Sequence, residues 1–191
     1  MKSVCVYCGS AAGKSPTYAK AAQQLAQHLV ERQLELVYGG GNVGLMKVIA
    51  DEVRRLGGHV TGVIPQALQE RELAHADLNH LYVVANMHER KAKMAELSDG
   101  FIALPGGIGT LEELFEMFTW LQLGFHQKPL GLLNVDAYYD PLLQFLQHAV
   151  GSEFLKPEHH ALLLRSSDPE QLLQQMQHFE DCLRHTPKQV T

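Results

Sequence analysis

The chain of 191 residues is poor in cysteine and contains no long uninterrupted apolar run. Its three cysteines, Cys5, Cys8 and Cys182, are too few and too irregularly spaced for a disulfide framework, which favours a reducing compartment. No apolar run reaches the roughly 18 residues that span a membrane, and the N-terminus lacks the apolar segment of a signal peptide. We therefore expect a cytoplasmic protein with no membrane partner.

Basic residues are also scarce, because 16 Lys and Arg stand against 21 Asp and Glu, for a net charge of -5. Nucleic acids require a basic surface, so we expect no nucleic-acid partner, although a helix N-terminus can bind a small anion at any overall charge. The 11 histidines show no H-E-x-x-H spacing, and the C-x-x-C pair of Cys5 and Cys8 has no second pair to complete a zinc site. We therefore expect no metal.

The length and the 46% hydrophobic content match one globular domain, which we place at residues 1–184, with a flexible tail at 185–191. Short apolar runs alternate with longer amphipathic stretches. The expected strands are residues 3–7, 34–38, 59–64, 80–84, 100–104 and 129–133. The expected helices are residues 17–32, 44–56, 89–97, 111–123, 138–149 and 168–178. This alternation predicts an α/β fold, a Rossmann-like doubly wound parallel sheet with helices on both faces.

Glycine-rich turns follow three of the expected strands, at residues 8–10, 39–44 and 105–110. In parallel sheets, ligands bind beyond the carboxyl ends of the strands, and free backbone N–H groups at a helix start bind anions. The alternative to an anion site is a simple tight connection. We favour phosphate binding strongly at the third turn and modestly at the second. The polar residues 65–79 are expected to form a loop over this site.

The second turn also fits the G-x-G-x-x-G pattern through Gly39, Gly41 and Gly44. That pattern is typical of dinucleotide binding, which requires an acidic residue at the end of the next strand. Residues 59–65 offer no carboxylate there, and the glycines follow the second strand rather than the first. A dinucleotide-dependent oxidoreductase is therefore the alternative function.

Two charged segments could carry chemistry. Thr110 and Glu113 either form a capping box, with Thr110 as N-cap, or leave the carboxylate of Glu113 facing a bound sugar. Arg90 and Lys91 either begin a solvated helix or reach a phosphorylated sugar. If Glu113 only caps the helix, the protein is a non-catalytic nucleotide-binding module.

These segments resemble the Lonely Guy family. Residues 105–113 match its P-G-G-x-G-T-x-x-E signature, and residues 87–92, 38–46 and 8–10 are similar to its other segments. The resemblance runs from about Lys2 to about Leu155. It implies hydrolysis of a cytokinin riboside 5'-monophosphate to the free base and ribose 5-phosphate, without a cofactor. Some bacterial members also cleave AMP.

The resemblance further implies that Arg90 and Glu113 are the catalytic pair. Hydrolysis of an N-glycoside passes through an oxocarbenium-like sugar, which a carboxylate such as Glu113 stabilises, unless it activates water instead. Arg90 would orient the ribose phosphate or hydroxyls. The implied substrate-binding residues are Gly9, Ser10, Gly39, Gly40, Gly41, Glu72, Met87, Lys91, Pro105, Gly106, Gly107, Ile108, Gly109, Thr110, Leu111, Glu112 and Thr119.

Two positions depart from the family pattern, because Lys47 and Ala137 stand where glycine is usual. The family has often carried a lysine decarboxylase label, but no lysine here has the sequence context of a pyridoxal site. The expected helix at residues 111–123 is apolar on more than one face, which is typical of a buried or interface helix. We therefore expect a homodimer, as the resemblance also implies.

Overall fold

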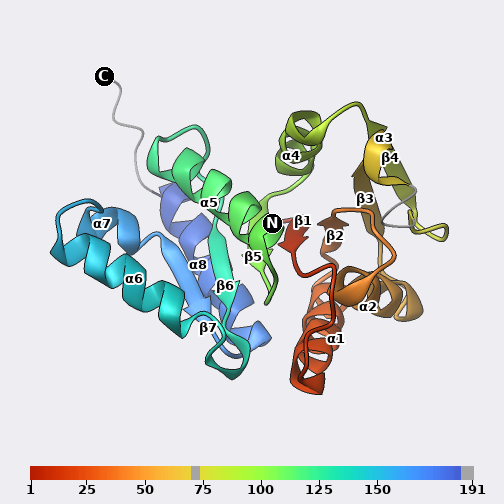
Figure 1. Cartoon of the computed structure of the whole chain (residues 1–191), viewed down its shortest axis with the longest axis horizontal. Helices are drawn as coiled ribbons and strands as arrows, with labels where there is room; N and C mark the ends of the chain where they lie inside the picture. Colours follow the sequence, from red (N-terminus) through yellow and green to blue (C-terminus); the bar gives the residue numbers. More distant parts are fainter. Residues whose placement is uncertain (70–73, 186–191) are drawn as a thin grey trace.

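A computed structural model describes residues 1–69 and 74–185 of the chain (Figure 1). Seven strands form one sheet in the order β4-β3-β2-β1-β5-β6-β7, and every pairing is parallel. The strands are β1 (Ser3–Tyr7), β2 (Glu35–Tyr38), β3 (Val60–Pro65), β4 (His80–Val84), β5 (Gly100–Ala103), β6 (Leu130–Leu133) and β7 (Leu163–Ser166). The order grows outward in both directions from β1, so the topological switch point lies between β1 and β5. The predicted doubly wound fold is confirmed.

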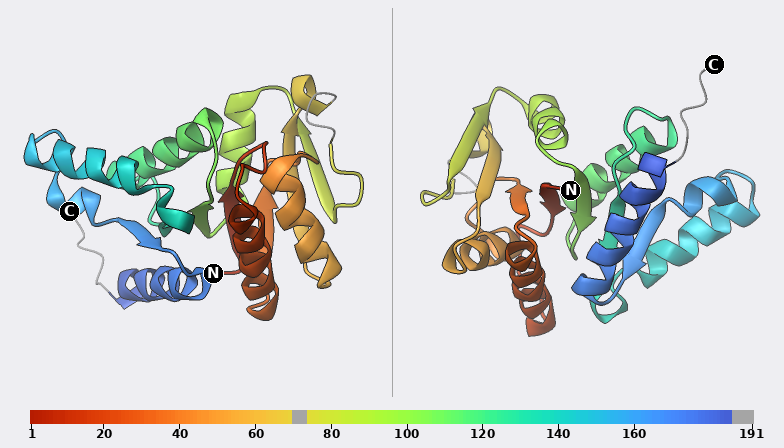
Figure 2. Two further views of the ribbon diagram at one scale, coloured as in Figure 1. Left: turned by 60° about the horizontal axis from the view of Figure 1, so that its bottom comes forward. Right: turned by 180° about the vertical axis from the view of Figure 1, so that it is seen from behind.

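Helices cover both faces of the sheet (Figure 2). On one face lie α1 (Pro16–Glu31), α2 (Gly44–Arg55) and α8 (Pro169–His185). On the other face lie α4 (Met87–Glu96), α5 (Ile108–Gln122) and α6 (Asp140–Gly151). The shorter helices are α3 (Gln66–Gln69), η1 (Val135–Ala137) and α7 (Pro157–His160). In the described part of the chain, no helix has both the length and the apolar character needed to cross a membrane.

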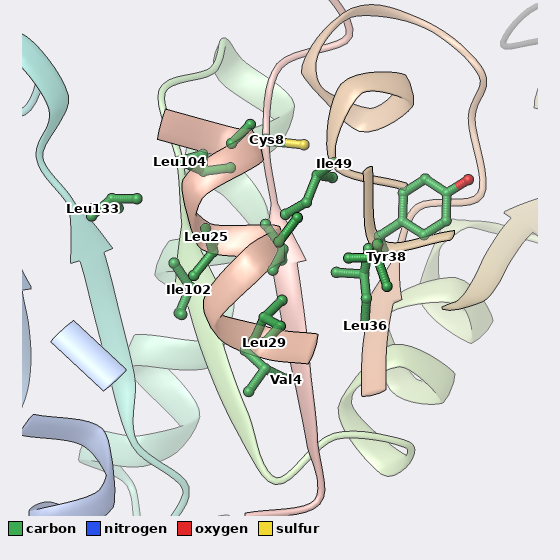
Figure 3. Packing of buried hydrophobic residues seen from close by; sticks show 14 of the residues in the cluster. Val4, Cys8, Leu25, Leu29, Leu36, Tyr38, Ile49, Ile102, Leu104 and Leu133 are labelled. Carbon is green, nitrogen blue, oxygen red and sulfur yellow. The ribbon is translucent and has the colours of Figure 1, made fainter. Parts of the chain in front are cut away.

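The central strands are apolar on both faces because each face packs against helices. Val4 and Val6 of β1 belong to the core under α1, whereas Cys5 and Tyr7 belong to the core under α5. Figure 3 shows Leu25 of α1 packed in the first of these cores with residues of the central strands. Burying one such leucine side chain contributes about 1.5–3 kcal/mol. The two cores hold β1 and β5 rigidly, and so fix the loops at their carboxyl ends.

The sequence located six of the seven strands to within one residue at each end. It missed β7, a short edge strand whose second half, Arg165 and Ser166, is polar and partly exposed. It placed the start of α5 three residues late, at residue 111 instead of Ile108. The stretch 65–79 is not one loop, because Pro65 ends β3 and α3 follows it. Of the predicted tail, His185 ends α8, and residues 186–191 lie outside the described residues.

Ala137, the last residue of η1, has a left-handed backbone conformation, with φ of +56°. A residue with a β-carbon is disfavoured there by about 1–2 kcal/mol, which explains why glycine is usual at this position. Glycine also costs entropy in the unfolded chain, by about 0.4–1 kcal/mol. The departure at Ala137 therefore carries a small strain that the fold tolerates.

We predict that Ala137→Gly raises the free energy of unfolding by about 0.5–1 kcal/mol, because relief of the left-handed strain exceeds the entropy lost. Denaturant titration measures this change. The control is Ala161→Gly, at an exposed alanine with an ordinary φ of -68°, which is expected to lose stability. Equal losses in both variants would contradict the strain at Ala137.

Candidate functional site

Two cavities lie side by side at the switch point, and both are lined by Ser10 and Gly107. We call the first the Arg90 cavity; its volume is about 280 Å³. Its lining residues are Cys8, Ser10, Met46, Leu68, Met87, Arg90, Gly107, Ile108, Gly109, Thr110, Glu112 and Glu113. We call the second the tyrosine cavity; its volume is about 290 Å³. Its lining residues are Gly9, Ser10, Ala11, Ala12, Gly13, Tyr18, Leu45, Pro105, Gly106, Gly107 and Tyr138.

The glycine turn before α5 enters the helix directly. Its N-cap is Gly107, so Thr110 is the third helical residue and not the cap. The capping-box interpretation of Thr110 and Glu113 is therefore wrong, because the helix starts earlier than the apolar pattern indicates. Thr110 is buried, and a β-carbon on Gly106 would clash with its hydroxyl oxygen. The glycine at 106 thus lets the turn close over Thr110.

Packing does not explain the other two glycines of this turn. A β-carbon added to Gly107 or Gly109 would meet no atom within 4 Å. Gly109 lies inside α5, where glycine costs about 1 kcal/mol relative to alanine. The first N–H groups of a helix have no acceptor within it, and no described side chain caps α5. The turn therefore offers open space and backbone donors to an anion.

The second glycine turn is built differently. The N–H of Leu45, in the first turn of α2, donates to the Gly9 carbonyl at 3.0 Å. A β-carbon on Gly44 would clash with the backbone of Ser10. The loop after β1 thus covers the start of α2, and glycine is required there for contact between two backbones. This contact argues against a dinucleotide phosphate at the second turn.

Arg90 lies one turn into α4 with only 5% of its surface exposed. Its Nη2 donates to the Gly39 carbonyl at 3.0 Å, and a β-carbon on Gly39 would clash with that same nitrogen. The start of α4 is fixed by Asn86, whose side chain accepts from the Glu89 N–H at 2.9 Å. The interpretation of Arg90 and Lys91 as a solvated helix start is wrong, because both side chains are buried.

Glu113 and Arg90 act electrostatically on the buried thiols at the end of β1. Burial raises the pKa of the Cys8 thiol far above its usual value, the carboxylate of Glu113 raises it further, and Arg90 partly opposes this. Burial and then Glu113 also raise the pKa of the Cys5 thiol, against smaller lowering effects of hydrogen bonds with Tyr7 and Ser98 and of Arg90. Both thiols therefore stay protonated at neutral pH. Among residues 1–69 and 74–185, no three His, Cys, Asp or Glu side chains gather as metal ligands would.

Lys91 pairs with two carboxylates of α5. Its Nζ donates to Glu112 and lies 3.1 Å from Glu116 Oε2. Burial alone would lower the pKa of Lys91, but these carboxylates outweigh burial and raise the pKa above its usual value. A lysine that forms a Schiff base must lose its proton, so Lys91 is poorly suited to a pyridoxal role.

The structure gathers most of the predicted site residues. The predicted residues that line the cavities are Gly9, Ser10, Met87, Arg90, Pro105, Gly106, Gly107, Ile108, Gly109, Thr110, Glu112 and Glu113. The predicted residues that line neither cavity are Gly39, Gly40, Gly41, Lys91, Leu111 and Thr119. Glu72 lies outside the described residues. Sequence reasoning missed Tyr18, which comes from a segment without a motif. Leu68 lies in the stretch 65–79 that was expected over the site, and Tyr138 follows Ala137 of the family pattern, but neither residue was singled out.

The fold and these cavities define a Rossmann-type α/β protein with a glycine-turn site at its switch point. Two solved structures share this fold. The molybdenum cofactor binding protein from Rippkaea orientalis aligns with a TM-score of 0.68 at 23% identity, over 93% of this chain and 95% of that one. The Moco carrier protein from Chlamydomonas reinhardtii aligns with a TM-score of 0.68 at 17% identity, over 94% and 98%.

Sequence comparison gives the family. A family model described as "Possible lysine decarboxylase" matches residues 46–176. Cytokinin riboside 5'-monophosphate phosphoribohydrolase LOG7 of Arabidopsis thaliana is 50% identical over 94% of this chain and 82% of its own length. The phosphoribohydrolase LOG of Oryza sativa subsp. japonica is 47% identical over 92% and 73%. The chain belongs to the Lonely Guy family.

The burial of two thiols predicts selective chemistry. We predict that a thiol reagent at neutral pH modifies Cys182, which is exposed on α8, and leaves Cys5 and Cys8 unmodified. Mass spectrometry of the intact, folded chain would show one adduct, and chemical unfolding would raise the number to three. Rapid modification of Cys8 in the folded protein would contradict its placement in the core.

Proposed function

We propose that this protein hydrolyses the N-glycosidic bond of a purine riboside 5'-monophosphate, releasing the free base and ribose 5-phosphate. The observation that carries the proposal is that Arg90, Glu113 and the uncapped glycine turn of α5 line one cavity. The Arabidopsis and rice relatives, which are named cytokinin riboside 5'-monophosphate phosphoribohydrolases, support a cytokinin nucleotide as substrate. We propose AMP as a second substrate.

In this mechanism the 5'-phosphate binds the backbone N–H groups at the start of α5, where helix and anion attract each other. Arg90 holds the ribose phosphate or hydroxyls. The bond between ribose C1' and the base nitrogen breaks, and the carboxylate of Glu113 stabilises the cationic sugar or takes a proton from the attacking water. Water adds its oxygen to C1', and the base leaves with a proton.

Two of the predicted site residues that line neither cavity hold residues that do. Gly39 holds Arg90, and Lys91 holds Glu112. Direct nucleotide contacts of Gly39, Gly40, Gly41, Lys91, Leu111, Thr119 and Glu72 remain predictions. Thr119 is exposed and its hydroxyl donates to the Phe115 carbonyl at 2.7 Å, so its oxygen can still accept a hydrogen bond.

Two observations disfavour the other candidate functions. A dinucleotide-dependent oxidoreductase needs a free helix start at the second glycine turn, where Gly9 instead accepts from Leu45. A non-catalytic binding module would use Glu113 as a helix cap, but Glu113 lies beyond the first turn of α5. The carboxylate lines a cavity beside a buried arginine, which fits catalysis better.

We further propose a homodimer formed through the surface around α5. Leu114 and Met117 face the core, whereas Leu123 and Phe125, just after the helix, are 58% and 73% exposed. Trp120 and Phe125 line a further cavity between α4 and the end of α5. An apolar surface of this kind favours a protein partner. We place the protein in the cytoplasm, where its three cysteines stay reduced.

We predict that Glu113→Gln lowers kcat by about two to four orders of magnitude, because the neutral amide can neither stabilise the cationic sugar nor accept a proton. The affinity for AMP should stay equal or increase, since a negative charge near the phosphate is removed. Turnover and calorimetric titration measure both quantities. Glu158→Gln, at an exposed site on α7, is the control. Wild-type turnover in Glu113→Gln would contradict the mechanism.

The companion variant is Arg90→Lys, which keeps one charge but loses the planar guanidinium that donates to Gly39. We predict that kcat/KM falls at least tenfold, through turnover, affinity or both. The steady-state kinetics of AMP hydrolysis test this. Kinetics equal to wild type would contradict a role for the guanidinium of Arg90 beyond its charge.

For the homodimer, we predict that Phe125→Asp converts the protein to monomers in sedimentation at micromolar concentration, because a charge replaces an apolar contact at the interface. The matched control is Val83→Asp, at an exposed apolar residue on edge strand β4, which should stay dimeric. A wild-type monomer at the same concentration would rule out the dimer.

A further inference from the structure

Asp51, on α2, lies at the centre of a small polar network outside the two cavities. Lys47, one helical turn earlier, donates from Nζ to Asp51 Oδ2 at 2.7 Å. His75, from the connection between β3 and β4, approaches the other oxygen, with Nε2 2.8 Å from Oδ1. Lys47 is one of the two departures from the family pattern. Its ammonium group pairs with Asp51 on the same helix.

The ring of His75 is held in one orientation. Only 6% of the residue is exposed, and Nδ1 accepts from the Asp77 N–H at 3.3 Å. Nε2 therefore carries the proton and donates to Asp51. Partial burial alone would raise the pKa of Asp51, but the hydrogen bonds from Lys47 and His75 outweigh it and lower the pKa below its usual value. Asp51 is a stable anionic acceptor for both partners.

The backbone around His75 connects this network to the site. The His75 N–H donates to the Gly40 carbonyl at 3.0 Å, and Ala74 forms an antiparallel bridge with Gly41. The neighbouring Gly39 accepts from Arg90 through its carbonyl. The same β3–β4 connection carries Leu68, which lines the Arg90 cavity. His75 thus binds the Gly40 carbonyl of the second glycine turn, and Gly39 of the same turn binds Arg90.

We propose that Lys47, Asp51 and His75 form a clamp that positions residues 39–41, and through them Arg90, for nucleotide binding. This inference rests on the proposed function. His75 lines neither cavity, so it is a positioning residue that acts through Gly40 and Gly41. Lys47 strengthens the clamp in this chain, where glycine is usual in the family.

The test compares His75→Ala with His75→Gln, whose amide nitrogen can still donate to Asp51. We expect His75→Ala to raise the KM for AMP about tenfold, with kcat changed less than about threefold, because the clamp positions binding groups and not the reacting atoms. His75→Gln should recover most of the loss. Lys47→Met should raise KM about twofold, since an exposed pair on one helix contributes little. The control is His28→Ala, at a histidine paired with Glu31 on α1, which should change neither constant.

Amide hydrogen exchange in the ligand-free protein supplies a second readout. We expect the N–H of residue 75, which donates to the Gly40 carbonyl in the wild type, to exchange at least tenfold faster in His75→Ala, while amides of β1 keep their protection. A wild-type protein that cleaves no nucleotide would refute the proposed function, but exchange would still test the clamp. Unchanged exchange at the N–H of residue 75 would overturn the clamp. Faster exchange with an unchanged KM, or a lower melting temperature alone, would overturn its role in positioning.

Discussion

The close contact between the guanidinium of Arg90 and the backbone of Gly39 is the constraint on which the site depends. A buried arginine needs acceptors, and Gly39 supplies a carbonyl at 3.0 Å. A β-carbon on residue 39 would occupy the place of Nη2, so the guanidinium would have to shift. The contact joins α4 to the end of β2, and it places a permanent positive charge beside the switch point between β1 and β5. The charge faces the glycine turn of α5 across one cavity.

The two glycine turns that look alike in sequence perform different tasks. At the second turn, glycine allows the loop after β1 to cover the start of α2. At the third turn, Gly107 and Gly109 leave space that no protein atom fills. The start of α2 thus packs against the loop after β1, whereas the start of α5 is left open to a ligand. The open helix start follows β5, whereas the dinucleotide fingerprint lies in the first βα turn, so the site fits a nucleotide monophosphate better than a dinucleotide.

The sequence predicted the fold well because its signals are local. Apolar runs such as residues 100–104 located strands buried on both faces, and the signature at residues 105–113 located the turn before α5. The edge strand β7 was not predicted because half of it is polar. Tyr18 of the site could not be predicted, since only the tertiary fold brings this residue of α1 to the cavity. The role of Gly39 depends on Arg90, 51 residues away, which no local pattern reveals.

The most direct measurement follows the products of one nucleotide. Purified protein is incubated with isopentenyladenosine 5'-monophosphate and, separately, with the corresponding riboside that lacks phosphate. Chromatography then quantifies free base, ribose 5-phosphate and inorganic phosphate. A phosphate held at the start of α5 and a carboxylate at the sugar predict equal amounts of free base and ribose 5-phosphate from the nucleotide, with little cleavage of the riboside. Release of inorganic phosphate without free base, or equal cleavage of nucleotide and riboside, would contradict this site.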